Sequence, residues 1–197
     1  MAAAPNPNEI KHPLQRSWTL WFDDGKRVPN VEWLDTLKQV ISVATVEDFW
    51  GVFNNVISPS KLASGSNFHF FETGVKPAWE DVRNQVGGKW TVVLKKKARG
   101  GRNNEEQESP VDKNWLNLLL ACIGESFPYA DQLTGLVVSI RSSHGDKISL
   151  WTSKSEDEEA VLAIGKYFRE QVLDCDVKVS YASHEEAQKR HSRYELP

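Results

Sequence analysis

Residues 133–153 read LTGLVVSIRSSHGDKISLWTS and decide the fold. Two runs rich in β-branched residues, 133–142 and 146–153, flank His144-Gly145-Asp146, which predicts two antiparallel strands joined by a tight turn. Because side chains alternate between the two faces of a strand, each run has an apolar face and a mixed face. The apolar face suits packing against helices and consists of Leu136, Val138, Ile140, Ile148 and Leu150. The mixed face adds two cations and an indole, and consists of Val137, Ser139, Arg141, Lys147, Ser149 and Trp151.

The rest of the chain supplies further strands and three main helices. Alternating or β-branched runs predict strands over 16–22, 68–72, 88–95 and 177–181. Helical spacing of apolar residues predicts helices over 46–56, over 112–125 and behind the acidic turn 156–159. Strands joined mostly by hairpins, with helices between them, predict an α+β fold in which one antiparallel sheet carries its helices on one face. The other face is then free to bind a ligand.

Length and composition limit the class of protein. A chain of 197 residues fits one domain, which we expect over 12–197 behind a disordered tail at 1–11, with a long polar loop at 96–111. Cys122 and Cys175 lack metal-ligand spacing, which favours free thiols in a reducing compartment. The start of the chain has no secretory signal, and no apolar run is long enough to span a membrane. We therefore expect a protein without membrane contact in the cytoplasm, with the nucleus as a second compartment that the sequence allows.

Charge and tryptophan content point to a local ligand site. The net charge of −3 argues against general coating by nucleic acid, so a nucleotide contact must come from one site. Eight tryptophans are far more than ordinary usage, and some of these rings should have a ligand. Four of the indoles stand within predicted strands or a predicted helix and are expected in the core: Trp18, Trp21, Trp90 and Trp115.

The string Pro77-Ala78-Trp79-Glu80-Asp81 carries the sharpest chemistry. An indole beside a carboxylate in a loop can stack on a base while the carboxylate accepts hydrogen bonds from a guanine-like edge. Trp33 could complete a sandwich, and two electron-rich rings around a cationic base such as 7-methylguanine gain about 2 kcal/mol when desolvated. The pattern alone equally allows a ring folded over the edge of the core.

The spacing of apolar residues in the predicted helices indicates a second functional surface. Nearly every residue over 115–123 is apolar, and Trp50 widens the apolar stripe of the first helix. One stripe would satisfy the sheet, so the excess indicates either a face covered by a partner or a deeply buried helix.

These residues resemble the eukaryotic translation initiation factor 4E family, whose members bind the methylguanosine cap of messenger RNA. The resemblance runs from His12 to about Tyr181 in six blocks kept in family order. Besides the start HPLQ, they are WTLWF at 18–22, TVEDFW at 45–50, KPAWED at 76–81, GGKW at 87–90, LLACIGE at 119–125 and GDKISLW at 145–151.

The resemblance implies a site and a partner surface. Trp33 and Trp79 correspond to the stacking pair, Glu80 to the acceptor for the guanine edge, and Trp151 to the residue that touches the methyl group. Arg141 and Lys147 correspond to the cations that contact phosphates. The ligand would be the 7-methylguanosine cap, with no cofactor and no metal, and the sheet would be curved with helices on its convex face and the pocket on its concave face.

The family's partners are the 4G-type scaffold and 4E-binding repressor proteins, which dock a helical peptide on the convex side. The matching residues are His12, Pro13, Leu14, Val46, Trp50, Leu116 and Gly124, whereas Asn117 replaces a usual acidic residue. Apart from such partners we expect a monomer.

The sequence also leaves two alternatives open. A relative that binds the cap without recruiting the scaffold would repress translation, and Asn117 together with Ser142-Ser143-His144, where a lysine is common, are departures of unknown effect. An enzyme reading would use Glu80 and Asp81 as general acid and base in nucleotide hydrolysis, but no histidine or phosphate loop accompanies them. The expected protein is therefore a binding module and not an enzyme.

Overall fold

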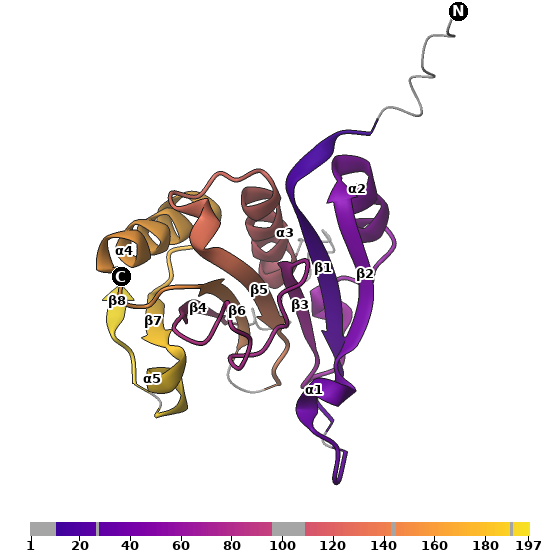
Figure 1. Ribbon diagram of the computed structural model, residues 1–197, viewed down its shortest axis with the longest axis horizontal. Helices are drawn as coiled ribbons and strands as arrows, with labels where there is room; N and C mark the ends of the chain where they lie inside the picture. The colour runs from indigo at the N-terminus through magenta and orange to yellow at the C-terminus, as the bar shows by residue number, and fades with distance from the viewer. Residues whose placement is uncertain (1–10, 27, 96–108, 143–144, 190) are drawn as a thin grey trace, which may run out of the picture.

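A computed structural model describes residues 11–26, 28–95, 109–142, 145–189 and 191–197 (Figure 1). Within this part of the chain, eight strands form one antiparallel sheet in the order β2-β1-β3-β5-β6-β4-β7-β8. The strands are β1 (Pro13–Asp23), β2 (Lys38–Thr45), β3 (Asn67–Glu72), β4 (Gly88–Leu94), β5 (Leu133–Ser139), β6 (Asp146–Thr152), β7 (Val179–Ser183) and β8 (Tyr194–Leu196). The predicted α+β class and its single antiparallel sheet are confirmed.

The three predicted helices are present with shifted ends, and α4 continues into a π-helical segment, Phe168–Val172. The α-helices are α1 (Trp33–Thr36), α2 (Val46–Phe53), α3 (Pro110–Ile123), α4 (Glu158–Tyr167) and α5 (His184–Gln188). Thr45 caps α2 by accepting from the Asp48 backbone N–H. Pro110 occupies the first turn of α3, where a missing N–H costs nothing, so this helix starts two residues before the predicted Asp112.

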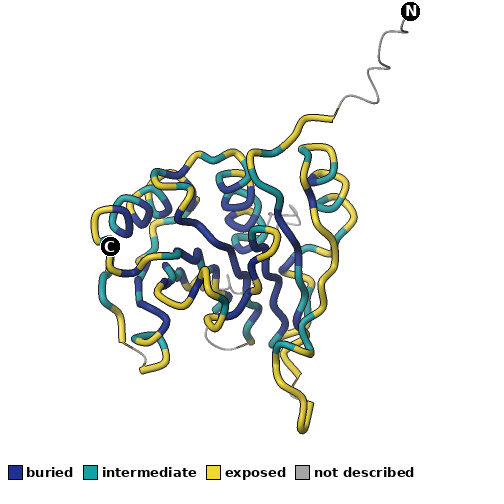
Figure 2. The backbone as a smooth tube through the Cα atoms, in the orientation of Figure 1, coloured by how far each residue is buried: buried dark blue, intermediate teal, exposed yellow. Residues whose placement is uncertain are grey.

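One face of the sheet packs against α2, α3 and α4. Strand residues Trp18, Phe70 and Leu150 share a buried cluster with Trp115 of α3 and Ile164 of α4. All five residues predicted for the apolar face of the hairpin belong to this cluster, which confirms the alternation argument. Figure 2 shows the central strands dark blue and the edge strand β2 mostly yellow, so the core lies under the middle of the sheet.

Two expectations about the fold are wrong. Only three of the seven connections join neighbouring strands (β1 to β2, β5 to β6 and β7 to β8), and the others pass one or two intervening strands, because local strand signals carry no information on which strands pair. Trp21 is half-buried and outside the main core cluster, unlike Trp18, Trp90 and Trp115. Trp18 and Trp21 lie three residues apart, so in a strand they point to opposite faces, and only Trp18 faces the helices.

The other face of the sheet carries smaller elements. In Figure 1, α1 and α5 lie below the sheet, on the side away from α2, α3 and α4, and the magenta loop between β3 and β4 lies between them. A small cluster of Phe71, Val75, Val137 and Trp151 is buried on this face. The face is therefore built from side chains of the sheet, with α1, α5 and one loop as its rim.

Some expectations concern residues beyond the described ranges. The predicted tail at 1–11 is described only at Lys11, whose ammonium pairs with Asp48 at 2.7 Å, and the predicted polar loop lies outside the described residues over 96–108. Ser143 and His144 of the hairpin turn also lie outside them. In the part that is described, no helix is long and apolar enough to cross a membrane, and no group of three or more His, Cys, Asp or Glu side chains is placed to hold a metal ion.

Candidate functional site

A cavity of about 490 Å³ opens on the sheet face away from α2, α3 and α4. It brings together five of the six residues predicted to contact base or phosphate, from α1, the β3–β4 loop, β6 and the segment after β5. These five are Trp33, Trp79, Trp151, Arg141 and Lys147. Residues more than 110 positions apart in the chain therefore line one cavity, which supports the predicted grouping.

Two exposed indoles line this cavity. Trp33 is 42% exposed and Trp79 is 49% exposed, although tryptophan is usually well covered in folded proteins. Trp79 lies in a loop fixed by Asn84, whose buried amide donates to the carbonyls of Lys76 at 3.0 Å and Ala78 at 2.8 Å. Trp33 donates from Nε1 to Asp23 Oδ2 at 3.0 Å. The Trp33 ring is thus anchored through its N–H and the loop that carries Trp79 is fixed, while both rings stay partly exposed.

Glu80 is the one predicted contact that does not line the cavity. It follows Trp79 directly, its side chain is exposed, and its backbone carbonyl accepts from Gln85 Nε2 at 3.0 Å. The neighbouring Asp81 has a structural role, because its carboxylate accepts from the backbone N–H groups of Lys76 and Arg83, each at 2.9 Å.

Three cations line the cavity. The Arg141 guanidinium donates to Asn67 Oδ1 at 3.0 Å and to the Ile140 carbonyl at 2.8 Å, and Lys147 is exposed. Lys89 was not predicted; its Nζ lies 5.6 Å from the ring centre of Trp151, within cation–π range. Burial, and secondarily the charge of Lys147, lower the pKa of Lys89. An anion bound in the cavity would offset the repulsion between the Lys89 and Lys147 ammonium groups.

The floor of the cavity is formed by an indole and an imidazole. Trp151 is 9% exposed and packs edge-on against Phe71, with a ring separation of 5.3 Å. His69 is buried, both of its ring nitrogens lack a hydrogen-bond partner within the described structure, and burial lowers its pKa to about 4. Sequence reasoning missed His69, although strand alternation places it on the face opposite Phe68 and Phe70.

The predicted partner surface lies on the other side of the sheet. The Val46 N–H donates to the His12 carbonyl at 2.9 Å, and the His12 N–H donates to Glu47 Oε2 at the same distance, so the start of β1 is tied to the start of α2. Hydrogen bonds from His12 lower the pKa of Glu47 to about 2. Trp50 is 36% exposed on α2.

The remaining partner residues have mixed accessibility. Pro13 and Gly124 are exposed, whereas Leu14 and Leu116 are half-buried against the core. Asn117 is half-buried and donates from Nδ2 to the Val172 carbonyl at 3.2 Å, so its amide already has a partner within the fold.

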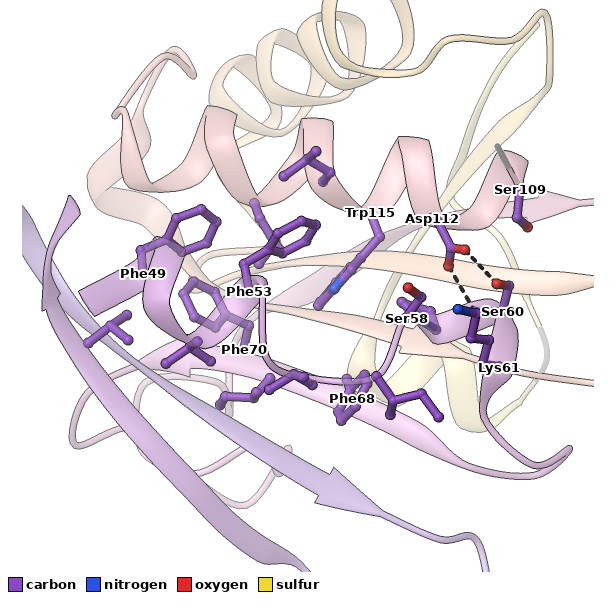
Figure 3. A pocket seen from close by; sticks show the side chains of 18 residues that line it. Phe49, Phe53, Ser58, Ser60, Lys61, Phe68, Phe70, Ser109, Asp112 and Trp115 are labelled. Atoms are coloured by element: carbon purple, nitrogen blue, oxygen red, sulfur yellow. Dashed lines mark hydrogen bonds between the residues drawn. The ribbon is translucent and has the colours of Figure 1, made fainter. Parts of the chain in front are cut away.

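A second cavity, of about 500 Å³, lies beneath this surface between α2, α3 and the sheet (Figure 3). Phe49, Phe53, Phe70 and Trp115 converge on its apolar part, while Asp112 closes one end by accepting from the Ser60 N–H at 2.8 Å. The cavity has one polar end, where Ser58, Ser60, Lys61, Ser109 and Asp112 lie, and none of its lining residues belongs to the first cavity.

Comparisons with known proteins agree with this arrangement. The model of the eukaryotic initiation factor 4E family matches residues 13–196. Eukaryotic translation initiation factor 4E of Dictyostelium discoideum is 42% identical over 181 residues, which cover 91% of this chain and 67% of the relative.

Two solved structures are similar over 95% of the chain. One is the complex of Caenorhabditis elegans eIF4E-3 with the 4E-binding protein Mextli and cap analog, at 37% identity and a TM-score of 0.80, with all of that chain covered. The other is the complex of Ascaris suum eIF4E-3 with m7G cap, at 37% identity and a TM-score of 0.82, with 99% of that chain covered. This chain belongs to the eukaryotic initiation factor 4E family.

Proposed function

We propose that this protein binds the 7-methylguanosine cap of messenger RNA in the cavity lined by Trp33 and Trp79. The observation that carries the proposal is the pair of indoles, both more than two-fifths exposed, on a cavity that also holds three cations. A methylated guanine is cationic and flat, so it gains stacking and cation–π energy between two indoles. Its phosphate chain would meet Arg141, Lys147 and Lys89.

Glu80 and Trp151 complete the proposed contacts with the base. Glu80 is an exposed carboxylate next to Trp79, and it would accept hydrogen bonds from the N–H edge of guanine once a base stacks on the ring. Trp151, on the cavity floor, would contact the methyl group.

The opposite surface would bind the helical peptide of a 4G-type scaffold or of a 4E-binding protein. Support comes from the accessible Trp50 and Val46 on α2, and from a relative solved with the 4E-binding protein Mextli. The protein would act as a translation initiation factor in the cytoplasm. In the alternative function, the protein would bind the cap in the same pocket but repress translation, and pull-down with scaffold and repressor peptides distinguishes the two.

The proposed role needs no catalytic group. The alternative acid–base pair, Glu80 and Asp81, is weakened because the Asp81 carboxylate is occupied by two backbone N–H groups that fix the loop. Incubation with capped RNA should therefore release no nucleotide.

Retention on a 7-methylguanosine matrix tests the proposal. Trp79→Ala should abolish retention, because one stacking ring is worth about 1–3 kcal/mol. Trp50→Ala, the same truncation on the other surface, is the matched control and should be retained. Normal retention of the Trp79 variant, or failure of the wild type to be retained, would show that the cavity is not the cap site.

A further inference from the structure

A buried carboxylate connects Trp33, which would stack on the base, to Arg141, which would contact phosphate. Asp23, at the end of β1, is 4% exposed. Its Oδ2 accepts from Trp33 Nε1 at 3.0 Å and from Asn67 Nδ2 at 2.9 Å, and its Oδ1 accepts from the Gly25 N–H at 2.7 Å. Asn67 in turn accepts from Arg141 at 3.0 Å. One hydrogen-bonded chain thus runs from the Trp33 indole to the Arg141 guanidinium.

The carboxylate is anchored in rigid backbone. Gly25 has a φ of +70°, and a Cβ there would lie 2.3 Å from the Gly65 carbonyl oxygen, so the turn after Asp23 is tightly packed and requires glycine. Asn67 is the first residue of β3 and pairs with Asp23 across the sheet. The position of the Asp23 carboxylate is therefore set by the β1–β3 pair and not by α1.

Trp33, in contrast, belongs to an element with little support of its own. Helix α1 has four residues, none of them buried, and no side-chain cap at its N-terminus. The bond to Asp23 is the hydrogen bond that the structure gives to the Trp33 side chain. A buried charged acceptor makes a strong, directional hydrogen bond. This bond can therefore fix the plane of the Trp33 indole, although about two-fifths of the residue is exposed to solvent.

The charge of Asp23 has a second effect. The donors that the described structure gives to its carboxylate are all uncharged: one indole, one amide and one backbone N–H. The nearby His69 is neutral near pH 7, since burial lowers its pKa to about 4. A negative charge bonded to the edge of an indole makes the ring face more attractive to a cation and leaves a neutral ring system almost unaffected.

We propose that Asp23 is a positioning residue that holds Trp33 as a preformed wall of the base site and raises the preference of the site for cationic 7-methylguanine over neutral guanine. The inference rests on the proposed function and identifies a determinant of its specificity. Asp23 acts through Trp33 and need not touch the ligand.

Asp23→Asn tests the proposal because it keeps the shape of the side chain and removes the charge. Affinity for 7-methyl-GTP and for GTP is measured by fluorescence titration, beside a thermal melt. The variant should bind 7-methyl-GTP about tenfold more weakly, as expected for the loss of a bond to a charged group, while GTP binding changes by less than about threefold. Asp24→Asn is the matched control: within the described residues the Asp24 carboxylate accepts from the Lys26 N–H, and both affinities should stay within about twofold.

A double-mutant cycle separates positioning from a general structural effect. In a Trp33→Phe background, which keeps an aromatic ring but removes the N–H, Asp23→Asn should not reduce selectivity further. Equal losses for 7-methyl-GTP and GTP, or a selectivity loss that persists in the Trp33→Phe background, would overturn the proposal. If the wild type itself does not prefer 7-methyl-GTP, it is the proposed function that fails.

A measurement on the unmodified protein keeps the test independent of how the variant folds. The Trp33 indole N–H signal, assigned by its loss in Trp33→Phe, should be shifted downfield and exchange slowly with water in the free protein, despite the exposed ring. A freely exchanging Trp33 N–H would overturn the positioning role whatever the behaviour of Asp23→Asn.

Discussion

Truncating Trp50 should separate partner binding from cap binding. Trp50 lies on α2 and packs edge-on against Phe49 and Phe53, with ring separations of 5.3 and 5.8 Å. It does not line the cavity that holds Trp33 and Trp79. Trp50→Ala therefore removes an accessible indole from one surface and leaves the other unchanged.

The exposed fraction of the ring sets the size of the effect. A tryptophan can bury about 250 Å², so the 36% of Trp50 that remains exposed corresponds to roughly 90 Å² available to a partner. At about 25 cal/mol per Å² this area is worth about 2.2 kcal/mol, or a loss of roughly fortyfold in peptide affinity. The covered part of the ring also contributes to stability, so the free energy of unfolding should fall without loss of the fold at 25 °C.

Fluorescence polarisation with a labelled scaffold-type helical peptide measures the first affinity, and titration with 7-methyl-GTP measures the second. The variant should lose peptide binding and keep cap affinity within about twofold, whereas Trp79→Ala should show the reverse. A thermal melt confirms that both variants are folded at the assay temperature.

Two results would refute this reasoning. Peptide affinity within about threefold of wild type in a folded variant would mean that Trp50 is not at the interface. Joint loss of both activities with a collapsed melt would mean that the ring is a core residue, for which truncation costs about 3–5 kcal/mol.

Three further predictions follow from the geometry. Lys147→Ala should weaken binding of 7-methyl-GTP more than that of 7-methylguanosine and give a shallower salt dependence in titrations, because an exposed cation meets phosphate and not base; equal losses for the two ligands would contradict this. Gly165→Ala should lower the melting temperature by several degrees, since a Cβ there would lie 2.1 Å from the Trp90 ring; an unchanged melt would show that the ring can move. Burial lowers the pKa of His69 to about 4, so between about pH 6.5 and 4 the unfolded chain binds more protons than the folded protein. On account of this group, the free energy of unfolding measured in urea should fall by roughly 2 kcal/mol from pH 7 to 5. His69→Gln should flatten this dependence of stability on pH.

The sequence by itself determined the parts of the molecule that depend on neighbours in the chain. Alternation over 133–153 assigned each side chain of the hairpin to its face, because a strand turns its residues to opposite sides whatever it pairs with. The Thr45 cap of α2 likewise depends on a contact only three residues along the chain. The site residues were proposed from stacking chemistry together with the family resemblance, and the motif at 77–81 gave the clearest signal.

Tertiary structure alone decided what depends on strand order. Lys89 and His69 join the cavity because β4 and β3 lie on either side of the β5–β6 hairpin, and no local pattern encodes that order. The bond between Asp23 and Trp33 requires the β1–β3 pairing and a turn that returns α1 to the end of β1. Loop-closing contacts of this kind depend on the energy of the whole packed sheet, so a short window of sequence predicts the residues of the site but not the groups that hold them in place.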